Sequence, residues 1–140
     1  MNAKHTLERY NQEQYTAQEA QRLAQQIIFA PITFQASRLM VKFGILDRLN
    51  RAAEGQTLEE IAQEAKLSRY AAQVLLEASL SIGTVLCENE RYRISKVGWF
   101  LIKDPMSPIN MDFVHDVCYQ AAFDLEAALL EGRPAGLKVF

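Results

Sequence analysis

The chain has 140 residues, which is enough for one domain with a hydrophobic core and too few for two ordinary domains. Hydrophobic residues make up 49% of it and charged residues 23%, a composition that excludes a largely disordered chain. The formal net charge of -2 argues against nucleic acid as a main partner, because binding to phosphates normally requires a basic surplus.

The sequence contains no targeting or membrane-spanning signal. The polar N-terminal segment lacks the apolar core of a secretory leader, and no apolar run approaches the roughly 20 residues that span a bilayer. Cys87 and Cys118 lie in apolar patterns, without a CxxC motif or paired histidines. We therefore expect a cytoplasmic protein without a membrane partner or a bound metal, whose two cysteines are buried, reduced thiols.

The first third of the chain is predicted to be helical. Residues 6–29 are rich in Gln, Glu and Ala, with an apolar stripe only in their second half, so they form one helix or two short ones. The polar first half should project or pack on a partner. Pro31 predicts the start of a new helix that runs to Asn50, with Gly44 as a break or a close packing contact.

The clearest motif in the sequence is a helix-turn-helix. Thr57 and Glu60 form a capping box at the start of a short helix that ends by Leu67. Ser68 is the N-cap of a second helix that reaches Ile82, where Gly83 can end it. Two helices joined by about three residues are typical of this motif.

A hairpin and a long helix complete the predicted fold. Residues 84–87 and 91–94 are strand-like around the polar turn 88–90, and Ser95 caps a further short helix that Asp104-Pro105 and Pro108 stop. The last helix covers about 110–131 and ends at Gly132 and Pro134.

The predicted fold is therefore mainly α: a winged helix-turn-helix with a small β-hairpin wing, extra N-terminal helices and a long C-terminal helix. We divide the chain into a helical dimerising arm (1–28), a winged-helix core (29–104), a long helix at a dimer interface or pocket wall (105–131) and a linker (132–140). The apolar end of that linker is unusual for a chain terminus, so we expect a further domain to follow it.

DNA binding is the first function that a helix-turn-helix suggests, since its second helix can read the major groove. Here that helix is apolar on two faces, and its remaining stripe carries one arginine, Arg69, together with Glu77. Between Thr57 and Lys103, six basic residues are balanced by six acidic ones. The sequence favours a helix covered on two sides over one that contacts phosphates.

Catalytic and cofactor motifs are missing from the sequence. The six glycines are scattered, with no GxGxxG or phosphate-binding loop, so we expect no catalytic residue and no cofactor site in this chain. His5 is predicted to face solvent. His115, with Asp112 and Tyr119 on the same helical face, either forms a surface ion pair or does acid-base or ligand-binding work.

An aromatic group on the last helix is the candidate binding site. Its members are Met111, Phe113, Tyr119 and Phe123. At helical spacing such residues belong either to a core or dimer interface or to the wall of a flat hydrophobic pocket.

The chain resembles the N-terminal domain of class I S-adenosylmethionine-dependent O-methyltransferases of the hydroxyindole and plant small-molecule type. The stretches that carry the resemblance are "FQASRLMVKFGILDRL", "TLEEIAQEAKLSRYAAQVLLEASLSIGTV", "YRISKVGWFL" and "GRPAGLKVF", and together they span about residues 29–140.

The resemblance implies a winged-helix-like module that forms a homodimer and does not bind DNA. It implies that Met111, Phe113, Tyr119 and Phe123 help to wall the pocket of a small-molecule acceptor. S-adenosylmethionine and the catalytic residues would belong to a following domain, so this chain alone is expected to be inactive. The alternative is a winged-helix DNA-binding regulator or ligand sensor that dimerises through its last helix.

Overall fold

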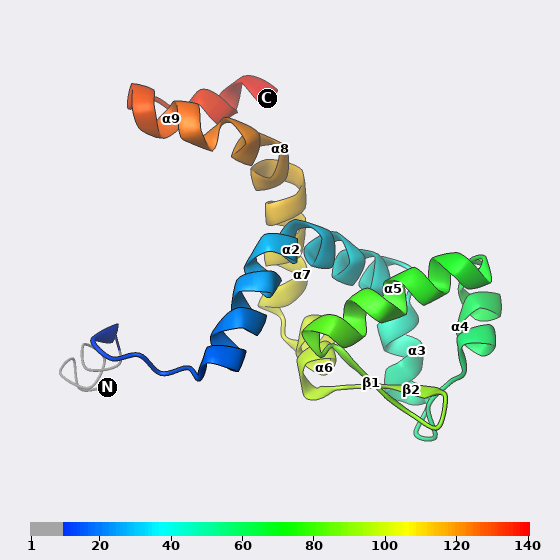
Figure 1. The fold of residues 1–140 in the computed structure, drawn as a ribbon. Coiled ribbons are helices and arrows are strands. Elements are labelled where there is room, and N and C mark those ends of the chain that lie inside the picture. Colours follow the sequence, from blue (N-terminus) through cyan, green and yellow to red (C-terminus); the bar gives the residue numbers. More distant parts are fainter. Residues whose placement is uncertain (1–9) are drawn as a thin grey trace.

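The computed structural model describes residues 10–140, and most of that range is helical (Figure 1). The elements in chain order are α2 (Ala17–Lys42), α3 (Ile45–Arg51), α4 (Leu58–Ala65), α5 (Arg69–Ile82), β1 (Val85–Glu88), β2 (Arg91–Ile94), α6 (Lys96–Lys103), α7 (Met106–Phe113), the π-helix η1 (Val114–Cys118), α8 (Tyr119–Ala121), η2 (Ala122–Asp124), α9 (Leu125–Glu131) and η3 (Ala135–Val139). The predicted fold class, mainly α with a small hairpin, is confirmed.

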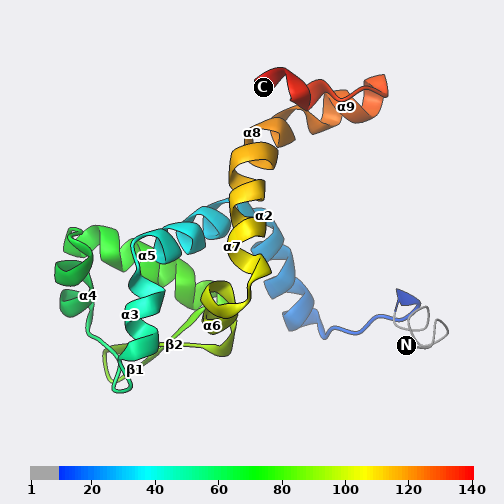
Figure 2. The ribbon, with the colours of Figure 1, turned by 180° about the vertical axis from the view of Figure 1, so that it is seen from behind.

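Two arms project from a helical body (Figures 1 and 2). The body contains α3 to α6, the hairpin and the second half of α2. The first half of α2 forms one arm, and the segment from η1 to η3, called the C-terminal arm below, forms the other. His5 and the first residues of the predicted 6–29 helix lie outside the described residues.

Pro31 lies inside α2 instead of starting a new helix, so that prediction is wrong. The helix begins after Thr16, whose capping box with Glu19 satisfies its first amides. Residues 11–16 are not helical. Proline lacks an N–H and bends a helix interior, and the Thr33 hydroxyl donates to the carbonyls of Phe29 and Ala30 beside it. The blue and cyan halves of α2 accordingly run in different directions (Figure 1).

The helix-turn-helix is confirmed nearly residue for residue. Gly44, at a φ of 69°, separates α2 from α3, as the sequence predicts for a break. Thr57 and Glu60 form the capping box of α4, and Ser68 caps α5. Gly83 ends α5 in the left-handed region with a φ of 76°.

The hairpin differs from the prediction by one residue at each end of its first strand. β1 starts at Val85 instead of Thr84 and continues to Glu88, which pairs with Arg91. The connection is therefore a two-residue turn, Asn89 and Glu90, with φ values of 51° and 61°. Two left-handed residues match the twist of the flanking strands, which explains why the turn is tighter than its polar stretch suggests.

The final helical stretch starts at Met106, earlier than predicted, and is not one regular α-helix. Pro108 is tolerated because it falls in the first turn of α7, where its missing N–H has no partner to lose. After α7 the chain passes through a π segment, a short α turn and a 3-10 turn before α9. Gly132 ends α9 as predicted.

The hydrophobic core lies where α2, α3, α4 and α5 meet. Its fully buried side chains are Met40, Ile45, Leu46, Leu49, Ile61, Leu76 and Val85. In α5, Ala72, Leu75 and Leu76 are buried as predicted, whereas Val74 and Leu80 are exposed. The prediction that both apolar faces of this helix are covered is therefore wrong for those two residues.

The two cysteines are free but not buried as predicted. Cys87 is exposed and Cys118 is half-buried. The apolar pattern around Cys87 misled the prediction because only the first residue of β1, Val85, reaches the core, and the strand is exposed from Leu86 onward.

Candidate functional site

The structure places three of the four candidate pocket residues in two separate hollows. Met111 is buried and helps to line a cavity of about 450 Å³ between α2, α6 and α7. Tyr119 and Phe123 line a second hollow of about 340 Å³, together with Pro31 and Ala122. Phe113 is exposed. Their shared role as an acceptor pocket stays a prediction.

The larger cavity is apolar with a few hydroxyls. Its walls come from α2, the end of α5, α6 and α7, with lining residues that include Ala30, Phe34, Ser37, Ile82, Leu101 and Val114. A volume of this size is within the range of small-molecule pockets.

Polar and aromatic contacts join the C-terminal arm to α2. The Tyr119 hydroxyl donates to the carbonyl of Pro31 at 2.6 Å, and the Tyr119 ring stacks on Phe34 with centroids 5.9 Å apart. One turn away, the Gln35 amide nitrogen Nε2 lies 3.0 Å from Nδ1 of His115. The contact between α2 and the C-terminal arm thus involves both Pro31, which lies inside α2, and the π segment.

His115 has a different environment from the one that its spacing suggests. The nearest carboxylate is that of Asp116, 3.9 Å from Nε2, instead of that of Asp112. Tyr119 is close, with ring centroids 6.4 Å apart, as predicted. Gln35 was missed, because no local pattern pairs residues 80 positions apart.

Large apolar side chains are exposed on both arms. On α2, in the first half and just past Pro31, they are Ile27, Ile28, Phe29 and Ile32. On α7 and the C-terminal arm they are Met106, Ile109, Phe113, Val117, Phe123, Leu125, Leu129, Leu130, Leu137 and Phe140, of which Phe123 is 90% exposed. Large apolar side chains exposed in such number on projecting segments indicate an interaction site in a folded domain. We call these two groups together the arm surface.

Polar side chains on the exposed face of the helix-turn-helix bind one another. Arg69 donates to Glu59 at 2.9 Å and to Gln73 at 3.2 Å, and Gln73 donates to Glu77. The hydrogen bond from Arg69 lowers the pKa of the Glu59 carboxyl below its ordinary value. The arginine that would meet a phosphate first is already bound to a carboxylate.

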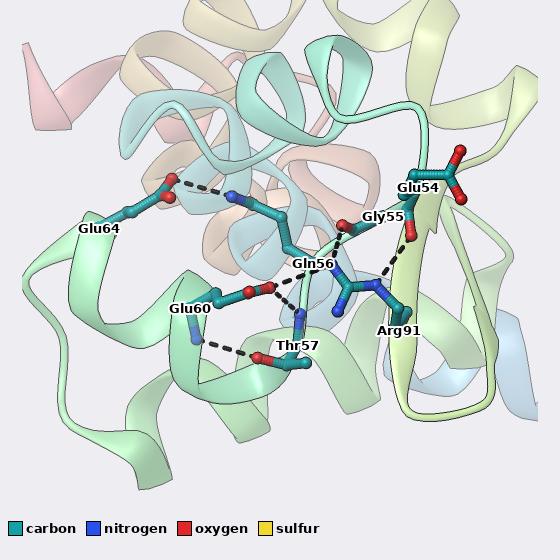
Figure 3. A network of polar contacts seen from close by, with 7 residues as sticks. All are labelled: Glu54, Gly55, Gln56, Thr57, Glu60, Glu64 and Arg91. Atoms are coloured by element: carbon teal, nitrogen blue, oxygen red, sulfur yellow. Dashed lines mark hydrogen bonds and ion pairs between the residues drawn. The ribbon is translucent and has the colours of Figure 1, made fainter.

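The two arginines of the wing are also engaged. Arg91 donates to the carbonyls of Glu54 and Gly55 and lies 3.4 Å from the Glu60 carboxylate, which itself caps α4 (Figure 3). Arg93 pairs with Glu88 at 2.8 Å. Arg91 thus connects the wing to the loop before α4.

The two wing arginines should differ in their effect on stability. We expect Arg91→Met to lower the free energy of unfolding by about 2 kcal/mol, because it leaves two loop carbonyls without their charged donor. Arg93→Met removes one exposed ion pair and should cost less than about 0.5 kcal/mol. Urea denaturation of both variants measures the difference. Equal losses would contradict a structural role for Arg91.

Within residues 10–140, no group of three or more His, Cys, Asp or Glu side chains is placed to hold a metal ion. Among the same residues, no helix combines the length and the apolar character that crossing a bilayer requires.

The fold and its arm surface define a helical interaction domain with a helix-turn-helix and a hairpin. Residues 21–92 match the family described as the Dimerisation2-like domain, and the chain belongs to that family. This match covers just over half of the chain and runs from the first half of α2 to the start of β2. No curated protein sequence matches the chain significantly.

Solved structures share the fold. The S-adenosylmethionine-dependent methyltransferase SibL, in its apo form, is 24% identical with a TM-score of 0.72, over 82% of this chain and 34% of its own. LepI in complex with SAM is 18% identical with a TM-score of 0.69, over 92% and 32%. Human N-acetylserotonin methyltransferase in complex with SAM is 18% identical with a TM-score of 0.62, over 95% and 37%. The chain thus spans about a third of these proteins.

Proposed function

We propose that this chain is the dimerisation and substrate-pocket domain of a cytoplasmic, S-adenosylmethionine-dependent O-methyltransferase. It pairs with a second copy of itself, and it takes a small-molecule acceptor instead of nucleic acid or a membrane. The methyl donor and the reacting groups belong to a following domain. Residues 132–140 then serve as the linker toward that domain.

The arm surface is the observation that carries this proposal. Its apolar side chains include Leu129 and Leu130, which are 74% and 81% exposed. Burying an exposed leucine contributes about 1.5–3 kcal/mol, so a surface with many such residues favours association strongly. The family to which the chain belongs is described as a dimerisation domain, and this supports a second copy as the occupant.

The methyltransferase part of the proposal is supported by the structural comparisons. Two of the three proteins are described as methyltransferases, and two of the structures hold SAM. This chain has no glycine-rich turn between a strand and a helix, which is what a cofactor of this kind usually needs. The cavity beside Met111 and the hollow beside Tyr119 are the surfaces that this chain can offer to an acceptor.

The regulator alternative has less support. A DNA-reading helix needs free basic side chains, and Arg69, Arg91 and Arg93 all pair with carboxylates of the same domain. The exposed side chains of α5 include Tyr70 and Val74, which are not phosphate ligands.

Amide hydrogen exchange at different protein concentrations tests where the chain associates. We expect residues 27–32 and 125–130 to gain protection as the concentration rises, because the partner's apolar side chains cover them. Amides of α5 around Tyr70 should show no such change and serve as the internal control. Protection that grows along α5 instead of the arms would contradict the proposed interface.

A further inference from the structure

A third hollow lies between α2 and the end of α5. Its volume is about 300 Å³, at the lower end of the range of small-molecule sites. Only residues of these two helices line it, and no described residue after Ile82 does. The hollow thus differs from the two described above, although Thr33 and Ile82 also line the cavity beside Met111.

The lining of this hollow changes from polar to apolar along α2. Arg22 and Gln26 lie at its N-terminal end, whereas Phe29 and Ile32 follow on the same face of the helix. Ile82 of α5 adds to the apolar end. At a rise of 1.5 Å per residue, Arg22 and Ile32 lie about 15 Å apart along the helix. A slim molecule with one polar end and an apolar body matches this length and polarity.

Arg22 is the charged residue of this lining, and its guanidinium is available to a ligand. Among the described residues, it forms no ion pair and no hydrogen bond. The acidic residue one turn earlier, Glu19, has its carboxylate bound to the amide and the hydroxyl of Thr16. On α5, the Glu77 carboxylate accepts from Gln73. An anionic end group would therefore meet a free guanidinium, with which a carboxylate forms charge-assisted hydrogen bonds.

The hydroxyl groups of the lining are already engaged. Ser81 donates to the carbonyl of Ala78 at 2.6 Å, and Thr33 donates to the carbonyls of Phe29 and Ala30. The apolar end therefore presents hydrocarbon surface without a polar group that a ligand would have to satisfy. Ala78 and Ser81 are also small, so the α5 side of the hollow leaves room for a ligand.

We propose that this hollow binds a free, slim organic carboxylate with an apolar tail, such as a medium-chain fatty acid. The carboxylate lies at Arg22, where the side-chain amides of Gln25 and Gln26 can also donate to it. The tail extends toward Phe29 and Ile32. This inference goes beyond the proposed function, because it assigns a ligand other than the methyl donor and the methyl acceptor.

Calorimetric titration with octanoate, 1-octanol and octylammonium tests the role of the charge. We expect octanoate to bind most tightly and octylammonium most weakly, since only octanoate pairs with Arg22. Arg22→Gln should weaken octanoate binding about threefold to fivefold, the effect of one exposed charge pair, and leave 1-octanol binding unchanged. Arg51→Gln changes an exposed arginine of α3 and is the matched control, which should bind octanoate like the unaltered chain.

The position of the tail is tested by NMR and by a blocking variant. Octanoate should shift the methyl resonances of Ile32, Ala78 and Ile82, which line the hollow. Ser81→Phe replaces an exposed serine of α5 and places a ring in the hollow, so it should abolish binding of all three probes. Its thermal unfolding by circular dichroism should stay close to that of the unaltered chain.

Phe29 and Ile32 also belong to the arm surface, so the titrations are repeated with Leu129→Asp/Leu130→Asp, in which the proposed dimer should separate. Three results would overturn the proposal: no octanoate binding to either chain, methyl shifts confined to other residues, or equal losses in Arg22→Gln and Arg51→Gln. Sedimentation measures the dimer separately. A monomeric chain that binds octanoate in this hollow would contradict dimerisation and support the carboxylate site.

Discussion

Replacing Gly98 by alanine should destabilise the domain by about 2–3 kcal/mol, although alanine normally favours a helix interior by about 1 kcal/mol. An alanine Cβ would lie 2.2 Å from the Thr84 carbonyl oxygen and 2.9 Å from Cγ1 of Ile94. The contact is with backbone, so no flexible side chain can move aside. Guanidinium denaturation should show a lower midpoint with an unchanged m-value.

Gly132→Ala is the matched control for this prediction. A Cβ there meets nothing within 4 Å, but the residue has a φ of +63°. The Gly132→Ala variant should therefore lose only about 1 kcal/mol of unfolding free energy, because alanine is strained in the left-handed conformation. If both substitutions lower the free energy of unfolding equally, α6 is not in close contact with the residue that precedes the hairpin.

Introducing two aspartates on the C-terminal arm should separate the proposed dimer. In Leu129→Asp/Leu130→Asp, two exposed apolar side chains of α9 become charged. Losing their burial removes at least about 3 kcal/mol of association free energy, which raises the dimer Kd about a hundredfold or more. Sedimentation velocity over a concentration series measures the change.

Tyr70→Asp is the control for the interface variant. Tyr70 is 76% exposed, but it lies on α5, outside the arm surface. The dimer Kd of the Tyr70→Asp variant should equal that of the unaltered chain. If the two variants weaken association equally, the interface is not on the arm.

The sequence predicted the helix-turn-helix well because its signals are local. Each capping signal acts within one helical turn. The structure has all of them as expected: the capping box of Thr57 and Glu60, the N-cap Ser68 and the helix-ending Gly83. Pro31 misled the prediction because a proline can either begin a helix or bend one. Here the helix continues through Pro31 into a half that packs on α3 and α5, a tertiary contact that local sequence signals do not display.

The candidate site was predicted less completely, for reasons that lie in its geometry. A period of 3.6 residues places Asp112 beside His115, but the π segment has a wider turn, and Asp116 is the neighbouring carboxylate instead. Gln35 joins the site only through the tertiary contact of α2 with the arm. Tyr119 and Phe123 do share a hollow, whereas Met111 belongs to a separate cavity.

Association of the chain with a second copy through its exposed arms is measured directly by sedimentation equilibrium at micromolar concentration. We expect a species near twice the chain mass of 15.9 kDa. A single species at 15.9 kDa that persists as the concentration rises would contradict it.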